Sequence, residues 1–182
     1  LGAANTFSGA LSINDGKVRY AAGGAGDLSA NAVNIWNSGV LDFAGDTDSL
    51  SALTIWSSGV TNSAAGGALS VVTLTMGGGP AGSSSYVMSG TGTLKLGGNV
   101  TFNAANDPNP AVIGGKLDLN GAGRTFVINN SAAPGTPVDM DISAVLSGGA
   151  TYGLTKNGTG LLRLSGSNTF DGAISMPDSS GS

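Results

Sequence analysis

The carboxylates are the side chains of this sequence with the most evident capacity for chemistry. Asp139 and Asp141 alternate with Met140 and Ile142 on one expected strand, so strand geometry would put both carboxylates on one face about 7 Å apart. A second acidic group comprises Asp42, Asp46 and Asp48. Paired acids of this kind can act in general acid–base catalysis or flank a glycosidic bond. The chain has no His, and no Lys or Arg lies nearby in sequence. We therefore interpret these groups as solvated acidic side chains and predict no catalytic residue.

Metal and thiol chemistry have little support in the sequence. The absence of Cys and His excludes a disulfide framework, a thiolate site and the commonest transition-metal ligands. The segment Gly23-Gly24-Ala25-Gly26-Asp27 resembles a fragment of the glycine-aspartate nonapeptide that binds Ca²⁺ in β-rolls. That motif occurs once here, whereas a roll needs tandem copies. We interpret it as a flexible corner, and predict no metal site and no cofactor.

Two tryptophans are the clearest candidates for binding. Trp36 and Trp56 occupy the same position in two nearly identical hexapeptides, which begin at Ile35 and Ile55. If the interval between these hexapeptides is one turn of a repeat, the two rings stack on adjacent turns. We favour a packing ladder that closes a corner, and an exposed platform for a sugar is the alternative. A second aromatic ladder is expected from Phe102, Phe126 and Phe170, each of which follows a Thr.

Composition restricts the elements that could position these residues. The chain has 182 residues, of which 32 are Gly, 10% are charged and 5% are aromatic, while 40% are hydrophobic. These values predict a folded chain with a thin core of small and branched aliphatic side chains. The seven basic residues are spread singly and the net charge is −4, so nucleic-acid binding is not expected. No apolar run is long enough to cross a bilayer as a helix, so we expect no membrane insertion by this segment.

Pairs of aliphatic residues separated by one polar residue recur along the chain at nearly regular steps. They are Val33/Ile35, Leu53/Ile55, Val72/Leu74, Leu94/Leu96, Leu117/Leu119, Met140/Ile142 and Leu162/Leu164. Each pair reads as a short half-buried strand, and the intervening Gly, Asn, Ser and Asp residues read as tight corners. The pattern predicts an all-β fold, a single-stranded parallel β-helix with rungs of roughly 20 to 23 residues, no long helix, and the pairs stacked in register on one sheet. We expect right-handed winding, by extension from parallel crossover connections.

A longer repeat joins the two ends of the sequence. Leu1–Ile13 aligns without gaps on Leu164–Met176, so that residues 1–163 make up one period of seven or eight rungs. We therefore expect residues 1–182 to be one continuous solenoid segment, made of one period plus an overlap. The first residue, Leu1, falls in the middle of the pattern and is not a start methionine, so we expect a fragment of a longer chain or filament.

Residues 154–172 carry a recognisable motif. The stretch reads LTKNGTGLLRLSGSNTFDG. It resembles the passenger-associated transport repeat of bacterial autotransporters, whose pattern is Leu-x-Lys-x-Gly-x-Gly-x-Leu-x-Leu-x-Gly-x-Asn-x-Tyr/Phe-x-Gly. The opening residues resemble the second half of the same repeat. This resemblance implies a right-handed β-helix that is exported to the bacterial surface, with repeats that serve folding and extension during secretion rather than catalysis.

Together these features predict a structural extracellular module of a surface fibre, filament or passenger stalk, and not an enzyme. Its expected partners are copies of itself or adjacent repeats, stacked head to tail. The alternative is an adhesin that binds surface glycans through Trp36 and Trp56 or through Ser/Thr-rich corners. A polysaccharide lyase of the β-helix type is a distant third, because the acidic residues lack a base.

Overall fold

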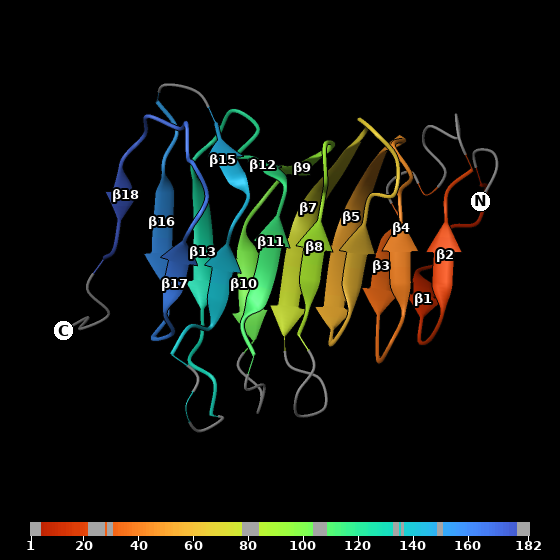
Figure 1. The fold of residues 1–182 in the computed structure, drawn as a ribbon, viewed down its shortest axis with the longest axis horizontal. Coiled ribbons are helices and arrows are strands. Elements are labelled where there is room, and N and C mark those ends of the chain that lie inside the picture. The colour runs from red at the N-terminus through yellow and green to blue at the C-terminus, as the bar shows by residue number, and fades with distance from the viewer. Residues whose placement is uncertain are drawn as a thin grey trace.

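The strand pairings of the described chain are all parallel, and they join segments about one turn apart in the sequence. The structure is a computed structural model that describes residues 5–21, 28, 31–77, 84–103, 109–132, 135, 137–148 and 151–177. These residues form 18 strands and no helix. Successive turns therefore stack along one axis as a parallel β-solenoid (Figure 1), which confirms the predicted fold class. No helix that could cross a membrane occurs among the described residues.

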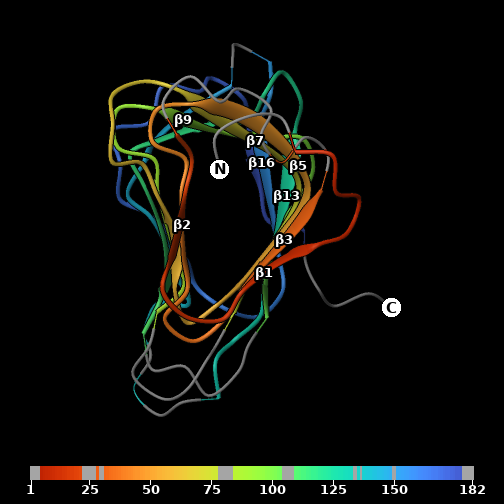
Figure 2. The same cartoon turned by 90° about the vertical axis from the view of Figure 1, so that its right-hand side faces the viewer.

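Two sheets enclose the core. The smaller one, which we call the second sheet, contains seven strands. They are β2 (Lys17–Arg19), β4 (Val40–Asp42), β6 (Gly59–Thr61), β8 (Tyr86–Met88), β11 (Ala111–Gly114), β14 (Met140–Ile142) and β17 (Leu162–Leu164). The first sheet contains eleven strands and has two parts, which we name the long face and the short face. Viewed along the axis, the turns superimpose around one interior, with β2 on one side and β1 and β3 on the other (Figure 2).

The long face runs the whole length of the described solenoid. Its strands are β1 (Leu11–Ile13), β3 (Ala32–Ile35), the second half of β5 (Thr47–Trp56), the second half of β7 (Ala68–Gly77), β10 (Val100–Asn103), β13 (Arg124–Ile128), β16 (Leu154–Asn157) and β18 (Ile174–Ser175). The short face consists of the first halves of β5 and β7 with β9 (Thr93–Leu96), β12 (Lys116–Asp118) and β15 (Val145–Ser147). Each turn can thus contribute up to three strand segments.

A corner within β5 and β7 separates the two faces. In β7, Leu69 and Val71 point inward, Val72 and Thr73 are both exposed, and Leu74 is buried again. Side chains alternate between inward and outward along a strand. Two consecutive outward residues therefore move the inward-facing positions along by one residue. The same shift occurs in β5, which pairs with β7 in register on both sides of the corner.

The core consists of the inward aliphatic and aromatic side chains of all three strand segments. They form one continuous cluster that extends from Ile13 to Leu154, and most of its members have no exposed surface. Burying one Leu, Ile or Val side chain stabilises a fold by about 1.5 to 3 kcal/mol, so this row of stacked aliphatics is the main source of stability. The thin core of branched residues matches the prediction from composition.

The turns are less uniform than the sequence spacing indicated. The number of residues between register partners varies from turn to turn. It is about one and a half times as large from Arg124 to Leu154 as from Val40 to Gly59. The predicted rung length is therefore too narrow a range. Seven strands in the second sheet delimit six complete turns, and the long face contains eight strands.

The predicted stacking of all aliphatic pairs on one sheet is wrong. Val33/Ile35 and Leu53/Ile55 are register partners on the long face, but Leu94/Leu96 lies on the short face and Met140/Ile142 pairs with Leu162/Leu164 on the second sheet. Val72 is an outward corner residue with 56% exposure, and Met76 takes the expected place beside Leu74. Inward and outward residues alternate in the same way in all three strand segments. The sequence pattern alone therefore does not show to which segment a given aliphatic pair belongs.

Candidate functional site: braced corners and a tryptophan stack

Four carboxylates are buried against neighbouring turns. Asp42 and Asp139 are each 1% exposed, Asp48 is 3% exposed and Asp141 is 8% exposed. Our interpretation of the acidic groups as solvated side chains is wrong for these four. Each accepts hydrogen bonds from another turn or from a nearby loop, which compensates for the loss of water. The sequence signal for such braces is weak, because the donors lie about one turn away.

Asp48 joins its own turn to the one before. Its Oδ2 accepts hydrogen bonds from the Tyr20 hydroxyl at 3.0 Å and from the backbone N–H of Leu28 at 2.7 Å. Its Oδ1 accepts a hydrogen bond from the backbone N–H of Ser49 at 2.7 Å. Tyr20 and Leu28 are themselves buried, so this carboxylate fixes a corner that has no regular strand pairing.

Asp42 braces the turns on either side of it. Its Oδ1 accepts hydrogen bonds from the backbone N–H groups of Ala44 at 3.1 Å and Ser63 at 3.0 Å, and its Oδ2 lies 3.5 Å from Arg19 Nε. Burial by itself would raise the pKa of Asp42. Hydrogen bonds from Ser63 and Ala44, together with the charge of Lys17, outweigh burial and hold this pKa below its ordinary value. The side chain is therefore an ionised acceptor at neutral pH.

Asp139 and Asp141 have separate sets of partners. Asp139 accepts hydrogen bonds from the backbone N–H groups of Ser131 and Leu161, both at 2.7 Å. Asp141 accepts hydrogen bonds from Arg163 Nη2 at 2.9 Å and from the Ser165 hydroxyl at 2.7 Å. The hydrogen bond from Arg163 is the main reason why the pKa of Asp141 is lowered, and the Ser165 hydroxyl and the charge of Arg163 add to it against burial.

Arg163 was not recognised from the sequence as a partner of Asp141. It lies one turn further along the chain, directly opposite Asp141 in the register of β14 and β17. The solenoid converts this long separation in sequence into direct contact. Both carboxylates therefore act as fixed hydrogen-bond acceptors between turns.

Neutral side chains brace other corners in the same way. Asn62 accepts a hydrogen bond from the backbone N–H of Gly45 at 2.6 Å, and it donates to the carbonyl groups of Gly66 at 2.8 Å and Ser89 at 3.1 Å. The hydroxyl of Ser89 accepts a hydrogen bond from the backbone N–H of Lys116 at 2.7 Å. These residues were read from the sequence as turn formers, and their role between turns was missed.

The tryptophans form the predicted stack on adjacent turns. The ring centroids of Trp36 and Trp56 are 5.7 Å apart and the ring planes differ by 3°. In the next turn Gly77 is the register partner of Trp56, and a Cβ built there would lie 3.0 Å from Trp56 Cζ3. The missing side chain thus leaves room for the indole. Trp36 is 40% exposed. Whether the stack only packs or also binds a ligand stays a prediction.

The predicted phenylalanine ladder is offset. Phe102 and Phe126 are fully buried on neighbouring strands, but Phe102 is the register partner of Ile128, and Phe126 is the partner of Val100. Phe170 lies outside the strands and packs against the core while remaining partly exposed. All three contribute to the core, but they do not form a ladder in register. The calcium-type segment Gly23–Asp27 lies outside the described residues.

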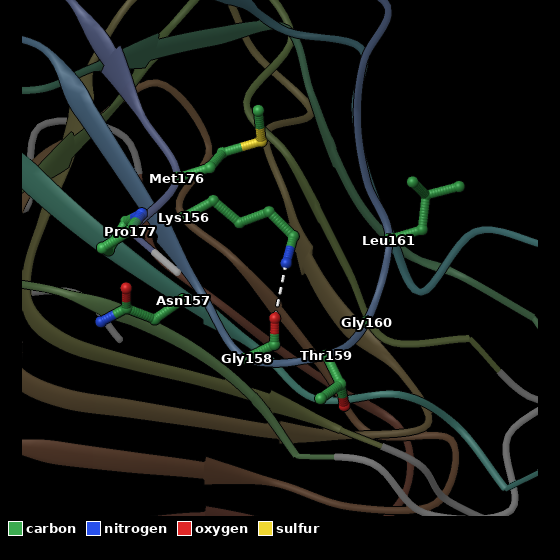
Figure 3. Close-up of a pocket in the computed structure, with 8 residues that line it drawn as sticks. All are labelled: Lys156, Asn157, Gly158, Thr159, Gly160, Leu161, Met176 and Pro177. Carbon is green, nitrogen blue, oxygen red and sulfur yellow. Dashed lines mark hydrogen bonds between the residues drawn. The ribbon is translucent and has the colours of Figure 1, made fainter. Parts of the chain in front are cut away.

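A hollow of about 930 Å³ opens where the described chain ends (Figure 3). It is lined by Lys156, Asn157, Gly158, Thr159, Gly160, Leu161, Met176 and Pro177. Lys156 Nζ donates a hydrogen bond to the carbonyl group of Gly158 at 2.7 Å, and this lysine is the one titratable side chain of the lining. Leu161 and Met176 are 54% and 74% exposed. The hollow thus presents apolar side chains and a tight turn, and the buried carboxylates are not part of it.

Comparison with protein families identifies the motif at the two ends. The family model of the passenger-associated-transport-repeat matches residues 1–19 and 154–175, less than a quarter of the chain. The chain carries the passenger-associated transport repeat. We found no match among curated proteins and none among solved structures. The repeat and the parallel β-solenoid fit a structural module of a passenger domain.

The structure gives a physical reason for the residues of the repeat in its second copy, residues 154–175. A Cβ on Gly160 would lie 2.6 Å from the carbonyl oxygen of Asn129, and Gly158, whose φ is +81°, approaches the carbonyl oxygen of Ile128 even more closely. Only glycine allows the two turns to come so near. Asn168 accepts a hydrogen bond from the backbone N–H of Leu146 at 3.1 Å. The conspicuous positions of the repeat thus contact the preceding turn.

Proposed function

We propose that this chain is a structural segment of a secreted bacterial passenger, in which stacked turns build an extended stalk or fibre at the cell surface. The observation that carries this proposal is the use of the repeat residues. In the second copy, the glycines and Asn168 contact the turn before them. The buried carboxylates likewise accept hydrogen bonds from backbone groups and from Arg163, so they stabilise the stack.

The first copy, residues 1–19, supports stacking onto a further turn. Gly9 aligns with Gly172, yet a Cβ on Gly9 would meet no atom of the described residues within 4 Å, whereas one on Gly172 would collide with the backbone of Tyr152. Phe7, which aligns with Phe170, is 40% exposed. We propose that a solenoid turn ending like β16 and β17 packs against this copy, head to tail, either within one polypeptide or between copies.

The exposed edges are suited to such a contact. β18 pairs only with β16 among the described strands, and β17 only with β14, so each presents one unpaired edge. Open edges of parallel strands template further pairing. The exposed apolar residues Leu161, Ile174 and Met176 would be buried by the next turn. A heterologous contact of this type extends into an open stack instead of closing into a ring.

A tandem chain tests this proposal, with residues 1–163 placed before residues 1–182. The expected product is one continuous solenoid that unfolds at a higher temperature than the single unit, because the inner copy of residues 1–13 gains a turn beneath it. Changing the inner Gly9 to Val should then destabilise the tandem chain, although the same change in the single unit is nearly neutral. Two independent unfolding transitions, or an inner Gly9→Val change without effect, would contradict the proposal.

Association of the single unit tests the version without a covalent link. Mass photometry and negative-stain microscopy over a concentration series should reveal rods that lengthen in steps of roughly 34 Å per unit, the length of about seven strand spacings. Gly9→Val should shorten these rods. Monomers at all concentrations would restrict the proposal to stacking within one polypeptide.

A further inference from the structure

One cluster of exposed side chains lies at a corner of two adjacent turns. Asn14, Asp15, Trp36, Asn37 and Ser38 are all exposed and lie where β1 and β3 end. Asn14 immediately follows Ile13, the register partner of Ile35, so it lies opposite Trp36 in the adjacent turn. The Ser38 hydroxyl donates a hydrogen bond to Asp15 Oδ1 at 2.7 Å, which links the same two turns. We name these five residues the tryptophan corner.

The stack leaves one aromatic face without an aromatic partner. Trp56 is covered by Trp36 on one side and approaches Gly77 on the other. Trp36 has Trp56 on one side only, and the residue opposite its other side is the shorter Asn14. The residue at the register position beside Trp36 therefore carries an amide, and the carboxylate of Asp15 and the hydroxyl of Ser38 lie close in sequence. An apolar ring face with a few hydrogen-bonding groups beside it matches the two surfaces of a pyranose, its C–H patch and its hydroxyl groups.

Next to the tryptophan corner, the long face carries a row of outward-pointing residues without charge. Each member of this row is the register partner of the member in the next turn. Its members, which we name the polar row, are Ser12, Asn34, Thr54, Thr75, Thr101, Val127 and Asn157. None is charged, although the long face also contains Arg124 and Lys156 towards its C-terminal end. The short face and the second sheet carry outward charged residues such as Lys95, Lys116, Lys17 and Arg163. The row places a hydroxyl or amide group about every 4.8 Å along most of the axis.

The charge distribution selects the kind of ligand. The chain has a net charge of −4, Asp15 is part of the tryptophan corner, and the polar row supplies no cation to pair with a carboxylate or sulfate. The net negative charge and Asp15 together disfavour an acidic polysaccharide, although the exposed Lys17 follows Asp15 by two residues. A neutral polysaccharide loses little hydrogen-bonding free energy when it binds, because hydroxyl and amide groups of the protein can replace its hydrogen bonds to water.

We propose that the tryptophan corner is a binding subsite for one ring of a neutral polysaccharide, whose chain continues along the polar row. Trp36 stacks on the sugar ring, Asn14 and the Asp15–Ser38 pair bind its hydroxyl groups, and Thr54, Thr75 and Thr101 contact the following sugars. Trp56 has a positioning role, since its parallel ring holds the indole of Trp36 in one orientation. This role is separate from the stacking of turns and does not depend on it.

Fluorescence titration of the intact chain tests the subsite, because Trp36 and Trp56 are its only two tryptophans. The probes are cellohexaose, laminarihexaose and chitohexaose as neutral chains, and hexagalacturonate as an acidic one. We expect saturable changes in emission with at least one neutral hexamer and none with the acidic hexamer. Trp36→Ala should weaken binding about tenfold or more, as measured by calorimetry. Tyr152→Ala is the matched control, because Tyr152 is 39% exposed at the opposite end of the chain and its loss should leave affinity unchanged.

Polar variants separate a subsite from a general effect of the stack. Asn14→Ala and Ser38→Ala alter exposed residues outside the core, and each should weaken binding severalfold without changing the circular dichroism spectrum. Thr75→Lys should weaken binding of the hexamer but not of the corresponding disaccharide, whereas Thr93→Lys on the short face should affect neither. Absence of binding to all three neutral hexamers, binding that survives Trp36→Ala, or preference for hexagalacturonate would each overturn the proposal.

Discussion

The two copies of the repeat have similar sequences and opposite surroundings. In the second copy, Gly172 approaches the backbone of Tyr152, Phe170 packs against the core, and Asn168 accepts a hydrogen bond from Leu146. In the first copy, no atom of the part of the chain that the structure describes lies within 4 Å of a Cβ built on Gly9, and Phe7 is 40% exposed. The difference is the turn that lies beneath. The comparison teaches that this motif encodes contacts between turns more than the conformation of its own turn.

The largest difference between the copies is expected from the paired glycines. Gly172→Val should lower the free energy of unfolding by about 2 to 3 kcal/mol, because the new side chain would collide with backbone atoms of Tyr152, which cannot move aside without disturbing β16. Gly9→Val should change stability by less than about 0.5 kcal/mol. Chemical denaturation of both variants measures the contrast. Equal losses of stability in the two variants would mean that each glycine is required by the conformation of its own turn and not by contact with the preceding turn.

The phenylalanines should give a smaller difference. Phe170→Ala removes a partly buried ring from the edge of the core, and we expect a loss of about 2 kcal/mol, less than for a fully buried ring. Phe7→Ala should cost well under about 1 kcal/mol, because much of this ring is already in solvent. Thermal unfolding followed by circular dichroism can rank the two. A larger loss for Phe7→Ala would reverse the comparison.

The smallest effect should come from the carboxylates that pair with arginines of the two copies. Arg19 of the first copy lies 3.5 Å from Asp42, and Arg163 of the second donates to Asp141 at 2.9 Å. The folded pKa of each carboxyl is below its ordinary value of 3.8, so its contribution to stability is complete above that pH and is lost as pH falls through the folded pKa.

Unfolding temperatures measured from pH 6 to pH 2 check this expectation. Asp141→Asn should flatten the acid side of the curve more than Asp42→Asn does, since the Arg163 contact is a direct hydrogen bond and the Arg19 contact is longer. Asp118→Asn is a control, because Asp118 caps its own loop through the backbone N–H of Asn120. If the unfolding temperature of Asp141→Asn depends on pH as that of the parent chain does, the ion pair with Arg163 does not contribute to the difference between the two copies.

Local pattern was enough to predict the architecture. The alternation in pairs such as Val33/Ile35 and Leu53/Ile55 identified short half-buried strands, and their recurrence identified a parallel solenoid, because only stacked turns let each strand pair with its own repeat. The near-identical hexapeptides also predicted that Trp36 and Trp56 would stack. The motif in residues 154–172 pointed to the passenger-associated transport repeat, which the family comparison bears out.

The tertiary structure decided which face each strand occupies and what the acidic residues do. Alternation with a period of two is the same on all three strand segments, so it could not assign Met140 and Ile142 to the second sheet or reveal the phase shift at Val72 and Thr73. The burial of Asp48 and Asp139 was also beyond the sequence. Their partners are backbone N–H groups of other turns, and such a donor exists at nearly every position of the chain, so only the variable turn lengths fix which one a carboxylate meets.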